Sequence, residues 1–155
     1  MDKNDFMKAA IAAARDSIDN HGGPFGAVIV KNGRIIAKAS NSVTKDNDPT
    51  AHAEVNAIRI AAKNLKTFDL SGCEIYTSCE PCPMCLGAIY WSRIDKIYYA
   101  GTKDDAKDAG FDDSFFYEEL EKPKEKRSVP MFMIDREEAL KVFKKWKEKE
   151  DKIEY

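Results

Sequence analysis

The spacing of apolar residues predicts a helix near each end of the chain. From Asp5 to Ser17 and just beyond, apolar side chains recur every three or four residues, as on one face of a helix: Met7, Ile11, Ala14 and Ile18. Residues 137–150 repeat this spacing among charged residues, which is typical of a helix with one solvated face. The apolar positions in that second stretch are Leu140, Phe143 and Trp146.

A third amphipathic stretch predicts a helix that carries candidate chemistry at its start. Asp48 is a suitable cap, Pro49 suits the first helical position, and the apolar stripe runs from Val55 to Leu65. This interpretation places His52 and Glu54 in the first turns. Residues two apart point to different sides of a helix, so both can serve one site only if the helix end itself abuts that site.

Five short apolar runs predict the strands, at residues 26–30, 34–37, 74–77, 96–100 and 129–134. The first two flank Asn32-Gly33, which is a strong signal for a type I′ hairpin. The third and fourth flank a helix expected over residues 81–91, and such a strand-helix-strand unit implies parallel pairing. Residues 104–117 are expected to be irregular. The pattern therefore predicts an α/β fold.

Two short motifs supply the ligands of a catalytic zinc site. His52-Ala53-Glu54 offers an imidazole and a carboxylate, and Pro81-Cys82-Pro83-Met84-Cys85 offers two thiolates. Catalytic zinc typically takes three protein ligands and leaves a fourth position for a water of lowered pKa. We expect His52, Cys82 and Cys85 to be the ligands of one zinc ion. Glu54 is then a catalytic general acid and base, and the pair of motifs is the signature of zinc-dependent nucleobase deaminases.

Cys79 leaves two other interpretations open. A structural zinc site would want four ligands, and Cys79 could supply the fourth; a Cys-x-x-Cys pair can also be a redox centre. A helix that begins at Pro81 favours the catalytic interpretation, because it places Cys82 and Cys85 on one face of its opening turns. The positive end of that helix favours thiolates there. Cys79 would lie at the end of the preceding strand.

Length and composition indicate a single cytoplasmic domain. A chain of 155 residues can bury a core without disulfides, and we expect residues 1–155 to form one deaminase domain. Three of the four cysteines lie between positions 79 and 85, which favours metal chemistry in a reducing compartment. No apolar run is long enough to span a membrane. The net charge of −2 and the lack of a basic run disfavour a nucleic-acid partner.

The zinc motifs resemble those of the cytidine-deaminase-like superfamily over roughly residues 5–101, and the chain looks most like its bacterial guanine deaminases. The run of residues 77–91, the segment 110–115 and the terminal Glu154-Tyr155 carry this closer similarity over nearly the whole chain. The resemblance implies a three-layer α/β/α fold with a central mixed five-stranded sheet. It implies hydrolytic deamination of guanine to xanthine and ammonia. A tRNA adenosine deaminase, a guanosine or cytosine deaminase and a non-catalytic zinc module remain alternatives.

The resemblance also implies roles for residues outside the zinc motifs. Asp113 matches a second acidic group that serves the leaving amine, although its neighbour Asp112 leaves the register open. Asn41 matches an amide that orients the base, and Phe25 matches an aromatic wall against it. Tyr155 matches a terminal residue that closes over the site, in its own or a partner subunit. The family further implies a homodimer, with residues 101–155 as a specific C-terminal segment that subunits can exchange.

Overall fold

The computed structural model describes residues 1–155, which divide into two compact units, Met1–Asp113 and Ser114–Tyr155. Unit 1 contains nine elements, which are α1 (Lys3–Asp19), β1 (Gly26–Lys31), β2 (Arg34–Ser40), α2 (Val43–Asp46), α3 (Ala53–Leu65), β3 (Cys73–Cys79), α4 (Pro83–Trp91), β4 (Lys96–Gly101) and α5 (Lys103–Asp108). Unit 2 contains α6 (Ser114–Glu121), the 3₁₀ helix η1 (Lys124–Lys126) and α7 (Arg136–Glu148). None of these helices is long and apolar enough to cross a membrane.

A mixed sheet forms the centre of unit 1, with strand order β2-β1-β3-β4. β1 is antiparallel to both β2 and β3, whereas β3 and β4 are parallel. The hairpin between β1 and β2 turns at Asn32 and Gly33, which both have positive φ, as a type I′ turn requires. The hairpin and the parallel strand-helix-strand unit predicted from the sequence are therefore confirmed.

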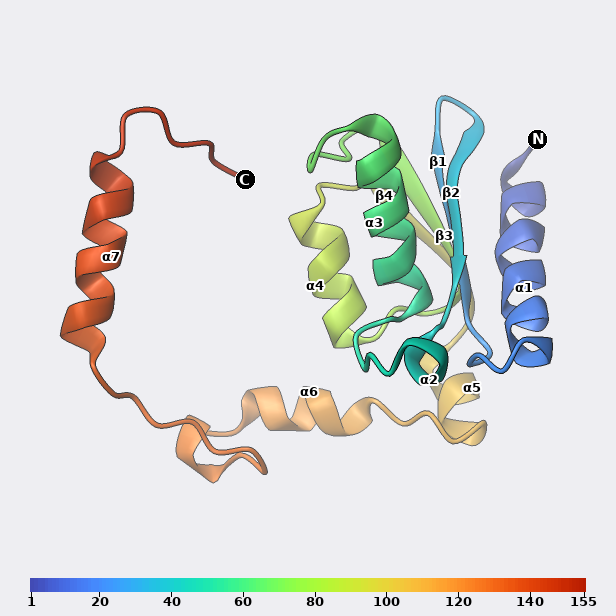
Figure 1. Cartoon of the computed structure of the whole chain (residues 1–155). Coiled ribbons are helices and arrows are strands. Elements are labelled where there is room, and N and C mark those ends of the chain that lie inside the picture. The colour runs from blue at the N-terminus through green and yellow to red at the C-terminus, as the bar shows by residue number, and fades with distance from the viewer. The chain divides into compact units, whose positions relative to one another are not determined.

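Helices cover both faces of this sheet, so unit 1 has the three layers expected (Figure 1). On one face, Phe6 and Ala10 of α1 pack with Val28, Val30 and Tyr76. The opposite face carries the larger cluster, in which α3 and α4 contribute Ala53, Ala57, Ala61 and Ile89 and the strands contribute Ala27, Ile29, Ala37, Cys73 and Ile75. Residues of β1 alternate between the two clusters, because successive side chains of a strand point to opposite faces.

Apart from Phe6, the face that α1 turns toward the sheet is lined by small residues, and it differs from the predicted stripe. Ala10, Ala13 and Ala14 are buried, whereas Ile11 is 37% and Ile18 is 57% exposed. A side chain at Gly26 in β1 would overlap the backbone oxygen of Ala10. Beside Gly26 the helix backbone lies so close to the strand that alanines fit there and larger residues do not.

The expectation of a fifth strand at Val129–Ile134 is wrong, and the sheet has four strands. The segment has no regular structure, and Val129 and Ile134 are each more than four-fifths exposed. A strand needs a partner, unit 2 contains none, and Pro130 has no N–H to donate to one. Residues 104–117 also differ from expectation, because they include most of α5 and the start of α6.

Candidate active site

His52 stands at the N-terminal end of α3, one residue outside the helix. The helix starts at Ala53 and not at Pro49 as predicted, and His52 is its N-cap with extended backbone angles. Asp48 caps no helix, because its carboxylate accepts hydrogen bonds from the backbone N and the hydroxyl of Thr50, at 2.8 and 2.7 Å. Since His52 precedes the helix and Glu54 lies in its first turn, the two side chains can serve one site despite their spacing.

Cys82 occupies the equivalent position at the start of α4. It is the N-cap, Pro83 is the first helical residue, and Cys85 follows within the first turn. The prediction that Pro81 opens this helix is wrong by two residues, because Pro83 takes that place. The predicted placement of Cys82 and Cys85 at the helix start is nevertheless confirmed. Both α3 and α4 thus direct their positive N-terminal ends toward the same group of ligands.

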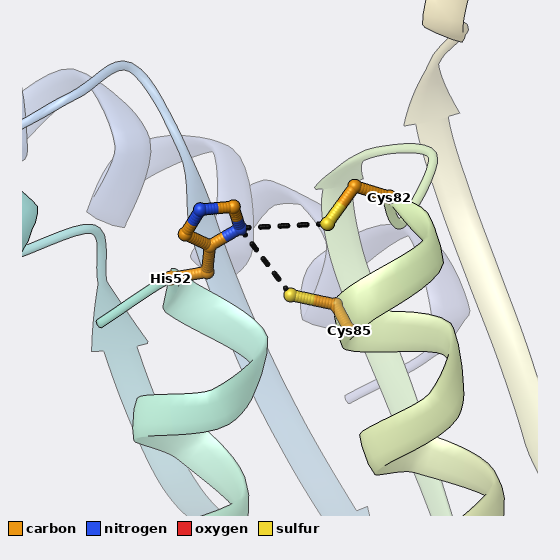
Figure 2. Close-up of side chains that lie close together, drawn as sticks. All are labelled: His52, Cys82 and Cys85. Carbon is orange, nitrogen blue, oxygen red and sulfur yellow. Dashed lines mark hydrogen bonds between the residues drawn. The ribbon is translucent and has the colours of Figure 1, made fainter. Parts of the chain in front are cut away.

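His52, Cys82 and Cys85 form a cluster suited to zinc (Figure 2). Nδ1 of His52 lies 3.6 Å from Sγ of Cys82 and 3.4 Å from Sγ of Cys85. Tetrahedral zinc with Zn–N of about 2.0 Å and Zn–S of about 2.3 Å places nitrogen and sulfur about 3.5 Å apart. The observed spacing fits that geometry, and Nδ1 is the nitrogen that would bind the metal.

The hydrogen bonds of the cluster favour the ionised form of one thiol. The side chain of Cys85 bonds to Cys82 and lowers the pKa of Cys82 to about 4. The same bond, together with burial, raises the pKa of Cys85. Hydrogen bonding to Cys82 raises the pKa of His52. Zinc binds cysteine as the thiolate and histidine as the neutral imidazole, so its binding displaces the protons of these groups.

Glu54 is buried next to this cluster. Its side chain is in hydrogen-bond contact with Cys85, and only 7% of the residue is exposed. Burial raises the pKa of Glu54, because a charged carboxylate is poorly solvated there. A carboxyl group of raised pKa beside a metal site suits a general acid and base.

Cys79 is close to the cluster but is not part of it. It ends β3, as predicted, and its Sγ faces the backbone oxygen of Thr102 at 3.6 Å. Its Sγ is not among the ligand atoms of His52, Cys82 and Cys85, which all lie within 4.8 Å of one another. The three-residue arrangement is therefore favoured over a four-ligand structural site or a redox site.

The structure distinguishes the two neighbouring aspartates. Asp112 lies 3.9 Å from the ammonium of Lys107, and its side chain is 45% exposed. Asp113 is partly buried, and this burial raises its pKa. The negative groups of Cys82 and Glu80 act in the same direction. Asp113 thus lies within electrostatic reach of Cys82, one of the zinc ligands.

Asn41 and Phe25, the two residues expected to contact the base, lie side by side. The backbone N of Asn41 donates to the backbone O of Phe25 at 3.0 Å. The ring of Phe25 meets Phe111 edge to face, with centroids 4.9 Å apart. Sequence reasoning missed Phe111 as a site residue, although it lies within the segment 110–115 that carried the family resemblance.

Asn56 links the two neighbours of Asn41 to Ala51, the residue before His52. Sequence reasoning also missed Asn56. Its Nδ2 donates to Ser40 O at 2.9 Å, to Ser42 Oγ at 3.0 Å and to Ala51 O at 3.3 Å. These bonds connect the residues on both sides of Asn41 with the residue before His52. A polar residue among the apolar positions of a helix is the signal that could have revealed it.

The end of the sheet at which the site lies is visible in Figure 1. The N-terminal ends of α3 and α4 meet there with the end of β2 and with α2, opposite the β1–β2 hairpin. Tyr155 ends unit 2 and is 73% exposed.

The first 101 residues match the family defined by the cytidine and deoxycytidylate deaminase zinc-binding region. The chain belongs to this family. Its His52, Cys82 and Cys85 form the zinc-binding site of that region. The fold expected from the motifs is thereby confirmed as cytidine-deaminase-like, with four strands in place of five.

One curated relative matches over the full length. Guanine deaminase of Bacillus subtilis is 52% identical over 100% of both chains. Its crystal structure superposes with a TM-score of 0.97 and covers 100% of this chain and 99% of that one. By contrast, the tRNA-specific adenosine deaminase of Aquifex aeolicus is 47% identical over 64% of this chain and 66% of its own. Similarity to the tRNA enzyme is therefore confined to part of the chain.

Proposed function

We propose that this chain is a zinc-dependent guanine deaminase, which hydrolyses guanine to xanthine and ammonia. The observation that carries the proposal is the full-length similarity to the guanine deaminase of Bacillus subtilis. That similarity extends beyond residue 101, where the deaminase zinc-binding region ends. The zinc cluster defines the reaction class, and the remaining third of the chain distinguishes guanine deamination within it.

The alternative with the same zinc chemistry is deamination of adenosine in tRNA. The tRNA-specific relative matches about two thirds of this chain. A polynucleotide substrate also favours a basic surface, because phosphate contacts supply much of the affinity. This chain has 27 acidic against 25 basic residues. A free purine base does not need a basic surface.

The chemistry at the zinc site requires a group that moves a proton. Bound zinc supplies a Lewis acid that lowers the pKa of water toward neutrality. Glu54 accepts a proton from the attacking water and returns it to the ring of the base. Its burial suits this role, because a carboxyl group of raised pKa exchanges a proton more readily near neutral pH.

Asp113 supports the second half of the reaction. Water adds at C2 of guanine, a C–O bond forms, the C2–N bond breaks, and the exocyclic amine needs a proton to leave as ammonia. We assign this proton transfer to Asp113, whose pKa is raised by burial near Cys82 and Glu80. The exposed Asp112, which lies near Lys107, is not assigned to the reaction.

Three further residues are proposed to hold the base. Asn41 donates through its carboxamide and orients the ring, and Phe25 forms an aromatic wall supported by Phe111. Tyr155 closes over the site and excludes water, which strengthens the electrostatic interactions inside it. The assignments of Asn41, Phe25 and Tyr155 are supported by the resemblance and, for the first two, by their shared hydrogen bond.

We further propose a homodimer in which subunits exchange residues 101–155, so that both units work in one deaminase domain. None of the helices of unit 2 has a buried residue. Its exposed apolar residues include Val129, Phe132, Met133 and Ile134. A second copy would cover them, and exchange costs little when the same contacts form between chains. A cytoplasmic location is also proposed, since thiolate ligands persist in a reducing compartment.

Ammonia release from a panel of guanine, guanosine, adenine and cytosine tests the proposed substrate. Guanine should be the best substrate, and xanthine should accumulate in equal amount to ammonia. Guanosine separates base from nucleoside specificity, because its ribose must fit in the site. Preference for cytosine or adenine would reject the assignment, while zinc-dependent deamination of any member would retain the reaction class.

A further inference from the structure

Asn41 forms hydrogen bonds with residues in three different parts of unit 1. The hydroxyl of Ser17 in α1 donates to the backbone O of Asn41 at 3.3 Å, and Asn41 N donates to Phe25 O at 3.0 Å. The backbone N of Val43 donates to Oδ1 at 3.1 Å. This last bond orients the carboxamide and leaves Nδ2 as its donor.

Two glycines, Gly22 and Gly23, pack closely against Asn41 because they have no side chains. A Cβ at Gly23 would lie 3.1 Å from both Cγ and Oδ1 of Asn41, so the carboxamide would have to move by a few tenths of an ångström. A Cβ at Gly22 would overlap the hydroxyl of Ser17 and lie 2.6 Å from the backbone O of Asn41. Neither glycine has a positive φ. Close approach to Asn41, and not backbone conformation, therefore explains why these positions are glycine.

We propose that the Gly22–Gly23 segment is a positioning element of the substrate site. The missing side chains let the segment lie against Asn41 and set the position from which its carboxamide meets the base. Gly23 acts on the side chain of Asn41, whereas Gly22 leaves room for the bond from Ser17. This inference rests on the proposed function, because that function assigns Asn41 to the substrate.

Gly23→Ala is the direct test, because it adds one methyl group against the carboxamide. The expected result is a fall of about tenfold in kcat/KM for guanine, since small misplacements of a positioning group slow catalysis strongly. Zinc content and Tm should stay near those of the parent. Gly87→Ala is the matched control, because a Cβ at Gly87 meets nothing within 4 Å. Equal effects of the two substitutions would overturn the inference.

A double-mutant cycle separates positioning from a general structural role. In an Asn41→Ala background, the methyl group added by Gly23→Ala no longer meets Cγ or Oδ1. Gly23→Ala should therefore cause no further loss in that background, although it causes loss in the parent. If Gly23→Ala lowers kcat/KM by the same factor in both backgrounds, Gly23 does not act through the Asn41 side chain. That result would contradict the inference.

A second readout does not depend on guanine turnover. The side-chain amide signals of Asn41 in an ¹H–¹⁵N spectrum, assigned by their loss in Asn41→Ala, should shift in Gly23→Ala and stay in place in Gly87→Ala. If the parent releases no ammonia from guanine, the proposed function fails, and this spectrum still decides the inference. Unshifted signals in Gly23→Ala would overturn the positioning role while leaving the proposed function intact.

If Gly23→Ala does not fold, Ser17→Ala tests the same positioning from the other side of Asn41. It removes the hydroxyl that bonds to Asn41 O, and the Asn41 amide signals should again shift. Ser92→Ala is its matched control, because Ser92 is equally buried and its hydroxyl also donates to a backbone oxygen, that of Ile89. If the Asn41 amide signals have the same positions in Ser17→Ala as in Ser92→Ala, the inference is rejected.

Discussion

His52 and Cys82 each cap the N-terminal end of a different helix, and Nδ1 of His52 lies 3.6 Å from Sγ of Cys82. The two ends meet because α3 and α4 lie on the same face of the sheet. Capping residues lie outside the helical backbone, so their side chains reach beyond the helix ends. The arrangement gives the metal site two helix dipoles that favour anionic ligands.

Removal of single cysteines tests the ligand assignment. Cys82→Ala and Cys85→Ala should each lose zinc and activity, because only two protein ligands remain. Cys79→Ala should keep one zinc per chain, since Sγ of Cys79 faces Thr102. Metal analysis of the purified variants measures this directly. Equal zinc loss in Cys79→Ala and Cys85→Ala would instead support a four-ligand structural site.

Glu54→Gln separates chemistry from metal binding. Glutamine keeps the size and polar shape of glutamate but cannot carry the proton. Zinc should remain, while kcat should fall by about a hundred- to ten-thousand-fold, the usual contribution of a general acid and base. Steady-state kinetics with metal analysis provides both numbers. Turnover within a few-fold of the parent would remove Glu54 from the mechanism.

Asp113→Asn tests the second proton carrier, with Asp112→Asn as its matched control. Both substitutions remove one negative charge from adjacent positions, but only Asp113 is partly buried near Cys82. Guanine turnover should fall by about a hundredfold or more in Asp113→Asn and little in Asp112→Asn. A larger loss of turnover in Asp112→Asn than in Asp113→Asn would show that Asp112 is the proton carrier.

Mixing two inactive or weakened variants tests exchange of the C-terminal segment. If Tyr155 serves the partner's site, Glu54→Gln and a variant lacking Tyr155 should complement one another after mixed refolding. Random pairing makes half of the dimers heterodimers with one intact site each, so about a quarter of the parent activity returns. Activity that stays at the mean of the two variants would place Tyr155 in its own subunit's site or outside any site.

Local signals in the sequence were sufficient for the hairpin and the zinc ligands. Asn32-Gly33 predicts its turn because both residues tolerate positive φ, and the observed angles agree. The roles of His52, Cys82 and Cys85 follow from ligand chemistry and spacing. Their exact positions as caps could not be predicted, since three prolines, Pro49, Pro81 and Pro83, each suit a helix start.

Features that depend on distant parts of the chain were missed. Val129–Ile134 has the composition of a strand, but strand formation needs a partner that local sequence does not reveal. The alanine face of α1 reflects its close approach to Gly26, a contact between separate elements. Asn56 escaped notice for the same reason, because its three acceptors lie in other segments.

A comparison of two substrates of the zinc-loaded protein decides between guanine deamination and tRNA editing. Ammonia release is measured under steady-state conditions from guanine and from a tRNA stem-loop that carries adenosine. We expect a higher kcat/KM for guanine, with one xanthine formed for each ammonia and with activity lost when zinc is removed. Faster deamination of the stem-loop than of guanine would instead identify the chain as a tRNA-editing enzyme.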